Sequence, residues 1–142
     1  MKLLKKILLV LACITLPFVL LCGGCTYATR YKITPIDSSL SPDGEHTLIF
    51  QAVGEPDFPF GLSHARVVLK EGKRTVTKRK IDVANDGGML HEDSWRVQWR
   101  ERDVRVILSG EEQPDRLYTF GFDGQVDAEG LDGQGVGFPE DQ

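Results

Sequence analysis

An apolar run at the N-terminus constrains this chain more than any other feature of its sequence. Residues 7–21 read ILLVLACITLPFVLL, and three lysines precede them within the first six residues. A basic head before an apolar stretch of this length is typical of an export signal. A buried core helix is the alternative, but helices of soluble domains normally keep one polar face. The pattern therefore predicts a helix that enters a membrane, either as a signal peptide or as an anchor.

Two kinds of anchor are compatible with this segment. Residues 21–25, LCGGC, resemble the lipobox of bacterial lipoproteins, and by that resemblance Cys25 is the lipidated residue and Gly24 precedes the cleavage site. The competing interpretation is an uncleaved membrane helix, because residues 7–28 are uncharged and about 20 apolar residues suffice to cross a bilayer. In both cases the basic head stays inside, so the following domain is expected at the outer face of the cytoplasmic membrane.

Beyond the apolar segment the chain is acidic and has no cysteine. The whole chain has a formal net charge of −4, and its first 25 residues carry three lysines and no acid, so the remainder has a net charge of −7. Nucleic-acid binding is not expected, because phosphate contacts need a clustered excess of Lys and Arg. The three cysteines are Cys13, Cys22 and Cys25, so no internal disulfide can stabilise an exported domain.

The middle of the chain has the pattern of short antiparallel strands. The side chains of Trp95, Val97 and Trp99 share one face, with the period of two that a half-buried strand shows. Turn residues separate the strand-like segments, with Pro and Gly in SPDG at 41–44 and Gly in EGK at 71–73. The six predicted strands cover residues 46–53, 65–70, 74–83, 95–99, 104–109 and 117–122.

These segments predict an all-β domain over residues 41–124. Six short strands without a helical period favour an antiparallel meander that forms a small sandwich or open barrel. Residues 1–25 are the signal peptide or membrane anchor in this interpretation, and the polar residues 26–40 form a tether. Residues 125–142 are rich in Gly and acid and contain no Lys or Arg, which predicts a disordered tail.

The SPDG segment allows two comparisons with known families. SPDG before a strand resembles the blade motif of TolB-type β-propellers, but a propeller needs four or more blades and one copy is present here. Residues 1–124 as a whole resemble small bacterial envelope proteins of unknown function, which combine a lipobox or membrane helix, an SPDG-led hairpin and a later tryptophan-bearing strand. This resemblance implies a place in the cell envelope and no particular activity.

No residue pattern predicts catalysis, a metal site or a cofactor. His46, His64 and His91 are 18 and 27 residues apart, without the short spacings of zinc sites, and are interpreted as isolated surface histidines. Glu92 and Asp93 beside His91 do not form an acid–base cluster, because neighbouring strand residues point to opposite faces. The chain has no Gly-x-Ser-x-Gly motif, and its acidic tail lacks the spacing of a calcium loop.

Two segments are candidate binding sites. The loop at 55–61, EPDFPFG, carries Phe58 and Phe60, which either close the end of the β domain as a core plug or form an exposed anchor for a partner. A predicted hairpin collects seven basic residues against one acid, and it is either a solvated face or a surface for anionic lipid headgroups or wall polymer. The seven residues are Arg66, Lys70, Lys73, Arg74, Lys78, Arg79 and Lys80, of which the last three form the densest group.

The sequence therefore predicts a membrane-anchored, extracytoplasmic accessory or binding module of the bacterial cell envelope, without catalysis. Expected partners are the membrane itself and anionic lipid headgroups, wall polymer or an envelope protein. The alternative is an enzyme, such as a hydrolase, that acts on envelope material. A pocket with converging His, Asp and Glu would favour the enzyme, whereas a dry core below a basic outer face would favour the binding module.

Overall fold

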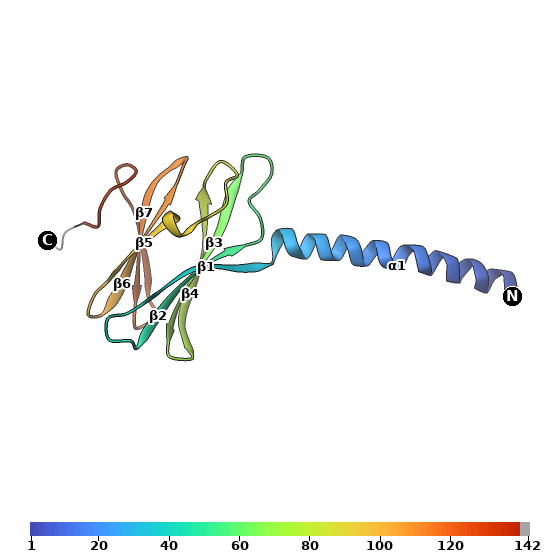
Figure 1. Ribbon diagram of the computed structural model, residues 1–142, viewed down its shortest axis with the longest axis horizontal. Helices are drawn as coiled ribbons and strands as arrows, with labels where there is room; N and C mark the ends of the chain where they lie inside the picture. Colours follow the sequence, from blue (N-terminus) through green and yellow to red (C-terminus); the bar gives the residue numbers. More distant parts are fainter. Residues whose placement is uncertain (140–142) are drawn as a thin grey trace.

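A long N-terminal helix and a two-layered β-sandwich make up the computed structural model, which describes residues 1–139 (Figure 1). The helix α1 (Lys2–Arg30) leads directly into the first sheet. Sheet A contains β1 (Ile33–Leu40), β2 (His46–Val53), β3 (Leu62–Glu71) and β4 (Arg74–Ala84), each antiparallel to its neighbour. A 3-10 helix, η1 (Glu92–Ser94), precedes sheet B, which contains β5 (Trp95–Trp99), β6 (Asp103–Gly110), β7 (Gln113–Gly121) and β8 (Val126–Gly130), again antiparallel.

The helix α1 exposes its apolar side chains along its whole length. None of its residues is buried against the sandwich. Thr15, Thr26 and Thr29 each donate a hydroxyl hydrogen bond to the carbonyl four residues earlier, so these polar groups do not depend on water. Among residues 1–139, α1 is the one helix long and apolar enough to cross a membrane, a property that it shares with signal sequences.

The hydrophobic core lies between the two sheets. Alternate side chains of the strands point inward, as the period of two requires. Two indole hydrogen bonds join β1, an edge strand of sheet A, to β5, an edge strand of sheet B. They run from Trp95 Nε1 to Asp37 Oδ2 at 2.9 Å and from Trp99 Nε1 to Ser39 Oγ at 2.8 Å. The tryptophan-bearing strand thus ties the two layers together. Fully buried core residues are Leu48, Phe50, Val67, Leu69, Val83, Val104, Val106, Leu108 and Phe120.

The structure confirms an all-β domain behind an N-terminal apolar helix, but the prediction of a six-stranded meander is wrong, because the sandwich has eight strands. The two additional strands lie outside residues 41–124, β1 in the expected tether and β8 in the expected tail. The sequence of β1 is polar because Asp37 and Ser39 point inward to bind the indoles of β5. A bulge between Pro35 and Asp37 also interrupts its alternation. A strand of this composition resembles a tether.

The C-terminal segment lies against sheet B, in contrast to the predicted disordered tail. Residues 125–139 contain β8 and a stretch that continues across the outer face of sheet B, whereas residues 140–142 of that prediction lie outside the described residues. Gln134 Nε2 donates to three backbone carbonyls of the β6–β7 hairpin. Arg105 Nη1 donates to the Pro139 carbonyl at 3.0 Å. These bonds account for the order of a segment whose composition predicts disorder.

Candidate membrane-facing site

The candidate site is the surface of the sandwich nearest to α1. Figure 1 shows sheet A between α1 and sheet B, so the outer face of sheet A is turned toward the helix side of the molecule. Gly54 N donates to the Lys32 carbonyl and Glu55 N to the Thr29 carbonyl, both at 2.7 Å. Gly54 has a φ of +71°, and a side chain there would collide with the Thr29 carbonyl. Direct backbone contacts therefore set the orientation of the sandwich relative to α1.

The predicted lipidation residue, Cys25, lies in the last part of α1. Its thiol is exposed, as are those of Cys13 and Cys22. Thr29, one helical turn later, forms the hydrogen bond to Glu55, so about 6 Å of helix separate Cys25 from the sandwich. A lipid on Cys25 and a membrane-spanning α1 would therefore both bring the β2–β3 loop close to the membrane surface.

The β2–β3 loop, residues 54–61, presents two aromatic side chains to solvent. Phe58 is 97% exposed and Phe60 is 72% exposed, so the interpretation of these rings as a core plug is wrong. The backbone of the loop is nevertheless held: Asp57 N donates to the Leu62 carbonyl at 2.9 Å and Gly61 N to the Asp57 carbonyl at 2.8 Å. Adjacent large apolar side chains that are exposed by a fixed backbone are typical of an interaction surface.

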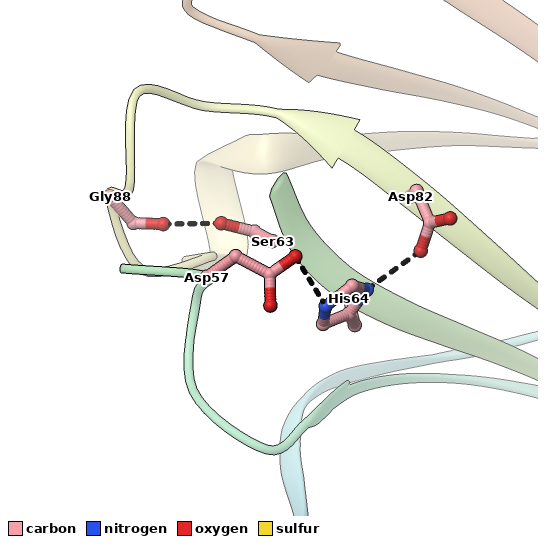
Figure 2. A network of polar contacts seen from close by, with 5 residues as sticks. All are labelled: Asp57, Ser63, His64, Asp82 and Gly88. Atoms are coloured by element: carbon pink, nitrogen blue, oxygen red, sulfur yellow. Dashed lines mark hydrogen bonds and ion pairs between the residues drawn. The ribbon is translucent and has the colours of Figure 1, made fainter. Parts of the chain in front are cut away.

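His64 connects this loop to sheet A (Figure 2). Its Nδ1 lies 2.7 Å from Oδ1 of Asp82, which is its partner in the β3–β4 register, and its Nε2 lies 3.3 Å from Oδ2 of Asp57 in the loop. The hydrogen bond with Asp82 is the main cause that raises the pKa of His64; Asp57 acts in the same direction, and partial burial opposes both. Protonated His64 is thus bound by two carboxylates and clamps the loop to the sheet.

The surroundings of His64 are unsuited to nucleophilic catalysis in this arrangement. The neighbouring hydroxyl of Ser63 lies on the opposite face of β3 and donates to the Gly88 carbonyl (Figure 2). Both ring nitrogens of His64 face carboxylates, which leaves neither nitrogen to take a proton from a substrate. The cavity beside His64 has a volume of about 10 Å³, room for roughly one water molecule. The geometry favours a structural clamp.

The predicted basic group Lys78, Arg79 and Lys80 divides between two faces of β4. Lys80 is opposite Arg66 in the register, on the outer face of sheet A, and Lys78 lies on the same face because strand side chains alternate. Arg79 is opposite the fully buried Val67, and its own side chain is exposed at the edge of the sandwich. The three residues therefore do not form one patch.

The outer face of sheet A still carries a basic group, which we define as Arg66, Lys70, Lys78 and Lys80 and name the basic face. Arg66 and Lys80 are like charges placed opposite each other on neighbouring strands, an arrangement that costs stability. Arg66 Nε donates to Gln51 Oε1 at 2.8 Å, and within residues 1–139 no carboxylate forms an ion pair with the four side chains. The basic face therefore has a local positive potential that favours an anionic partner.

The outer faces of the two sheets differ in how they are covered. On sheet B, Ile107 points outward but is fully buried, on the face that the C-terminal segment crosses. On sheet A, the outward side chains of Leu40, Lys78 and Lys80 are exposed. The outward side chain of Val68 in the middle of sheet A is 6% exposed, so the outer face of sheet A is open along its edge strands β1 and β4.

A second depression, lined by residues of sheet B and of the β4–β5 connection, is an open groove of about 580 Å³. It collects the ionisable side chains of His91, Asp93, Arg96, Glu111 and Asp115. Asp115 is fully buried; its Oδ2 lies 2.7 Å from Arg96 Nη2, and its Oδ1 has no hydrogen-bond partner among the described residues. The groove is thus a pocket lined by His, Asp and Glu together, the kind of lining that the enzyme alternative requires.

The turn between β1 and β2 contains the one group of side chains in the described chain whose donor atoms fit a cation. Asp43, Glu45 and His46 each bring one such atom to within 4.8 Å of the others. Asp43 already accepts hydrogen bonds from the Ser41 hydroxyl and the Glu45 amide, which lower the pKa of Asp43. The predicted SPDG turn is confirmed, since Gly44 donates to the Ser41 carbonyl at a φ of +77°. Hydrogen bonds suffice to close it, and we assign no metal there.

Comparisons of the chain with protein families, with curated proteins and with solved structures find no match. Function therefore has to be inferred from the geometry of this chain. Of the residues singled out in the sequence, the structure places Phe58 and Phe60 on the loop that contacts the end of α1 and puts Lys78 and Lys80 on the face turned toward it. His64 belongs with them, although its sequence neighbourhood indicates an isolated surface histidine.

Proposed function

We propose that this chain is a membrane-anchored, extracytoplasmic accessory or binding module of the bacterial cell envelope. In this proposal α1, or a lipid on Cys25, holds the sandwich at the outer face of the cytoplasmic membrane. The basic face then binds an anionic surface, either lipid headgroups or wall polymer. The observation that carries the proposal is that sheet A, whose outer side bears the basic face by strand register, lies between α1 and sheet B (Figure 1).

Electrostatics explains why the position of the anchor matters. At physiological ionic strength the Debye length is about 8 Å, so four surface cations act on an anionic surface only near contact. Each Lys or Arg close to an anionic membrane contributes roughly 1 kcal/mol, which makes the basic face a weak binding surface by itself. An anchor raises the effective concentration of the sandwich at the membrane, and weak contacts then become sufficient.

The test uses a soluble form that begins at Lys32 and therefore retains all of β1. We expect it to sediment with vesicles that contain anionic lipid, or with wall polymer, at low salt and to be released as salt is raised. Lys78→Ser combined with Lys80→Ser removes two charges from the basic face and should weaken binding about tenfold or more, given roughly 1 kcal/mol per cation.

The matched control combines Lys73→Ser with Arg79→Ser, which removes the same net charge outside the basic face. Circular dichroism establishes that both variants keep the fold. Equal losses in the two variants would show that net charge, and not the basic face, governs binding. If the soluble form binds neither surface at low salt, the binding role of the basic face is refuted.

An envelope hydrolase is the alternative function, and the groove with His91, Asp93 and Asp115 is the observation in its favour. This function requires turnover of envelope material that His91→Ala or Asp93→Ala abolishes. The variant with Lys78→Ser and Lys80→Ser should then retain that turnover on a soluble substrate. The two proposals are thereby separated by variants in different parts of the fold, β4 for the basic face and the β4–β5 connection for the groove.

A further inference from the structure

We infer that the β2–β3 loop inserts Phe58 and Phe60 into the interfacial region of the bilayer that anchors the chain. The inference rests on the proposed function, because it requires that the sandwich stay at the membrane. It adds an apolar contact that does not depend on anionic lipid. It also defines which part of the sandwich touches the membrane.

The level of the loop relative to the bilayer follows from α1. Residues 7–28 are uncharged and span about 33 Å as a helix, close to the roughly 30 Å of a hydrocarbon core. The outer boundary of that core then falls near Ala28. Thr29, the next residue, accepts the hydrogen bond from Glu55 N at 2.7 Å. The loop therefore begins at the level of the headgroups, and a lipid on Cys25, one turn earlier, sets a similar level.

Four exposed aromatic side chains lie in the segments at this level. Tyr27 lies in the last turn of α1 and Tyr31 directly follows the helix, while Phe58 and Phe60 follow Glu55 in the loop. Aromatic rings are enriched at membrane interfaces, and Phe is among the residues that form the apolar side of interfacial anchors. Insertion would remove two exposed rings from water, which is favourable because apolar area is lost from the solvent. The four exposed rings thus lie in two segments that are joined by the backbone hydrogen bond between Glu55 and Thr29.

The loop is held in place for such a contact. His64 binds Asp57, the residue before Phe58, and Gly87 N donates to the Gly61 carbonyl at 3.0 Å. A loop that is already ordered loses little conformational entropy when its side chains insert. When His64 is protonated, this pair offsets the charge of Asp57, which would otherwise oppose the entry of the neighbouring ring into an apolar region.

The test places a tryptophan at the tip of the loop in the full chain. Phe58→Trp replaces an almost fully exposed ring, so the fold should not change. The protein is reconstituted into neutral phosphatidylcholine vesicles, in which the basic face has no anionic partner, with or without lipids brominated near the headgroup end of the acyl chain. The emission of Trp95 and Trp99, measured on the unmodified chain in the same vesicles, is subtracted.

The matched control is Glu101→Trp, an exposed position beside the Ser41–Gly44 turn, at the end of the sandwich opposite to the loop. Interfacial apolar side chains lie roughly 5–10 Å into the boundary between headgroups and acyl chains, so F58W should lose about half or more of its added emission to bromine. E101W should lose almost none.

The outcomes separate this inference from the proposed function. If the protein does not float with the vesicles, the anchor fails and the inference fails with it. If the protein floats but F58W is quenched no more than E101W, membrane attachment stands and membrane insertion of the loop is refuted. Phe58 and Phe60 would then be expected to contact a protein partner. Quenching of F58W alone supports the inference whether or not the basic face binds anionic lipid.

Discussion

Asp115 is the one fully buried carboxylate among residues 1–139, and the stability of sheet B depends on how its charge is offset. Arg96 provides the offsetting charge, with Nη2 at 2.7 Å from Asp115 Oδ2, while its own side chain is partly exposed. The alternation of β5 predicts only that Arg96 faces away from the core. An outward strand residue can be solvated or can pair with a buried acid. Which of the two applies to Arg96 depends on Asp115 in β7, about twenty residues further along the chain, so the sequence of β5 alone does not reveal it.

Replacement of Arg96 should therefore lower the free energy of unfolding by far more than its place on the outward face of β5 suggests. Arg96→Ala leaves a buried carboxylate without its cation, and we expect the free energy of unfolding to fall by about 3 kcal/mol, the lower end for breaking a buried pair because Arg96 is partly exposed. Gln98→Ala, on the same face of the same strand but exposed, should change it by less than about 0.5 kcal/mol. Urea denaturation measures both. Similar values for the two variants would mean that Asp115 does not need its partner.

A pH titration should reveal the contacts of His64 with Asp82 and Asp57. Because Asp82 and Asp57 raise the pKa of His64 in the folded protein, the clamp stabilises the fold fully below the unfolded imidazole pKa of about 6.5. This contribution is lost as the pH rises through the higher pKa of the folded state. The effect is modest, because the side chain is one-third exposed. NMR titration of His64 measures it, and Asp82→Asn should return the pKa of His64 toward its ordinary value. An unchanged pKa in that variant would refute the clamp.

At the level of elements, the β3–β4 hairpin shows what limits prediction from the sequence. The turn at 71–73 and both strands are evident from alternation and turn residues. A regular hairpin through the Glu71–Arg74 pair would place His64 opposite Ile81, but the irregularity between Leu69 and Lys70 shifts the register by one residue and brings Asp82 to His64 instead. A bulge is set by packing and has no clear local signal, so the clamp could not be predicted, whereas the division of Lys78, Arg79 and Lys80 between two faces follows from strand alternation alone.

The edge strand β1 is the element whose role is easiest to test. It supplies Asp37 and Ser39 to the two indoles of β5 and covers one edge of β2. A soluble form that begins at Lys32 should fold. A form that begins at Ser41 lacks β1, so it loses both indole partners and the hydrogen bonds between β1 and β2. At about 1 kcal/mol for each lost hydrogen bond, in addition to the lost pairing, the melting temperature should fall by about 10 °C or more. Near-ultraviolet circular dichroism reports the tryptophans directly. Equal melting temperatures would mean that residues 32–40 are a tether after all.

On the scale of the whole molecule, sheet A lies nearer to α1 than sheet B does (Figure 1). The apolar helix and the existence of an all-β domain follow from the sequence, because a charge-free run and an alternation of period two are local signals. The placement of sheet A next to α1 does not, because it depends on the contact between Gly54 and the end of the helix, 25 residues apart. The covering of sheet B by the C-terminal segment could not be predicted either. It depends on contacts with distant residues, whereas the composition of the segment alone predicts disorder.

The proposed attachment to the membrane can be made by a lipid on Cys25 or by an uncleaved α1, and Cys25 is the residue that distinguishes the two. If the segment 21–25 acts as the lipobox that it resembles, the mature protein should lack residues 1–24 and gain a diacylglyceryl group, and Cys25→Ala should abolish both changes. Mass spectrometry of membrane-extracted protein measures them, with Cys22→Ala as the control that should change neither. An intact N-terminus in the unmodified chain would show that residues 7–28 span the bilayer instead. Because the contacts of Thr29 and Lys32 with the β2–β3 loop follow Cys25 in the chain, cleavage before Cys25 would leave them intact. The same surface of the sandwich is therefore expected to face the membrane in either case.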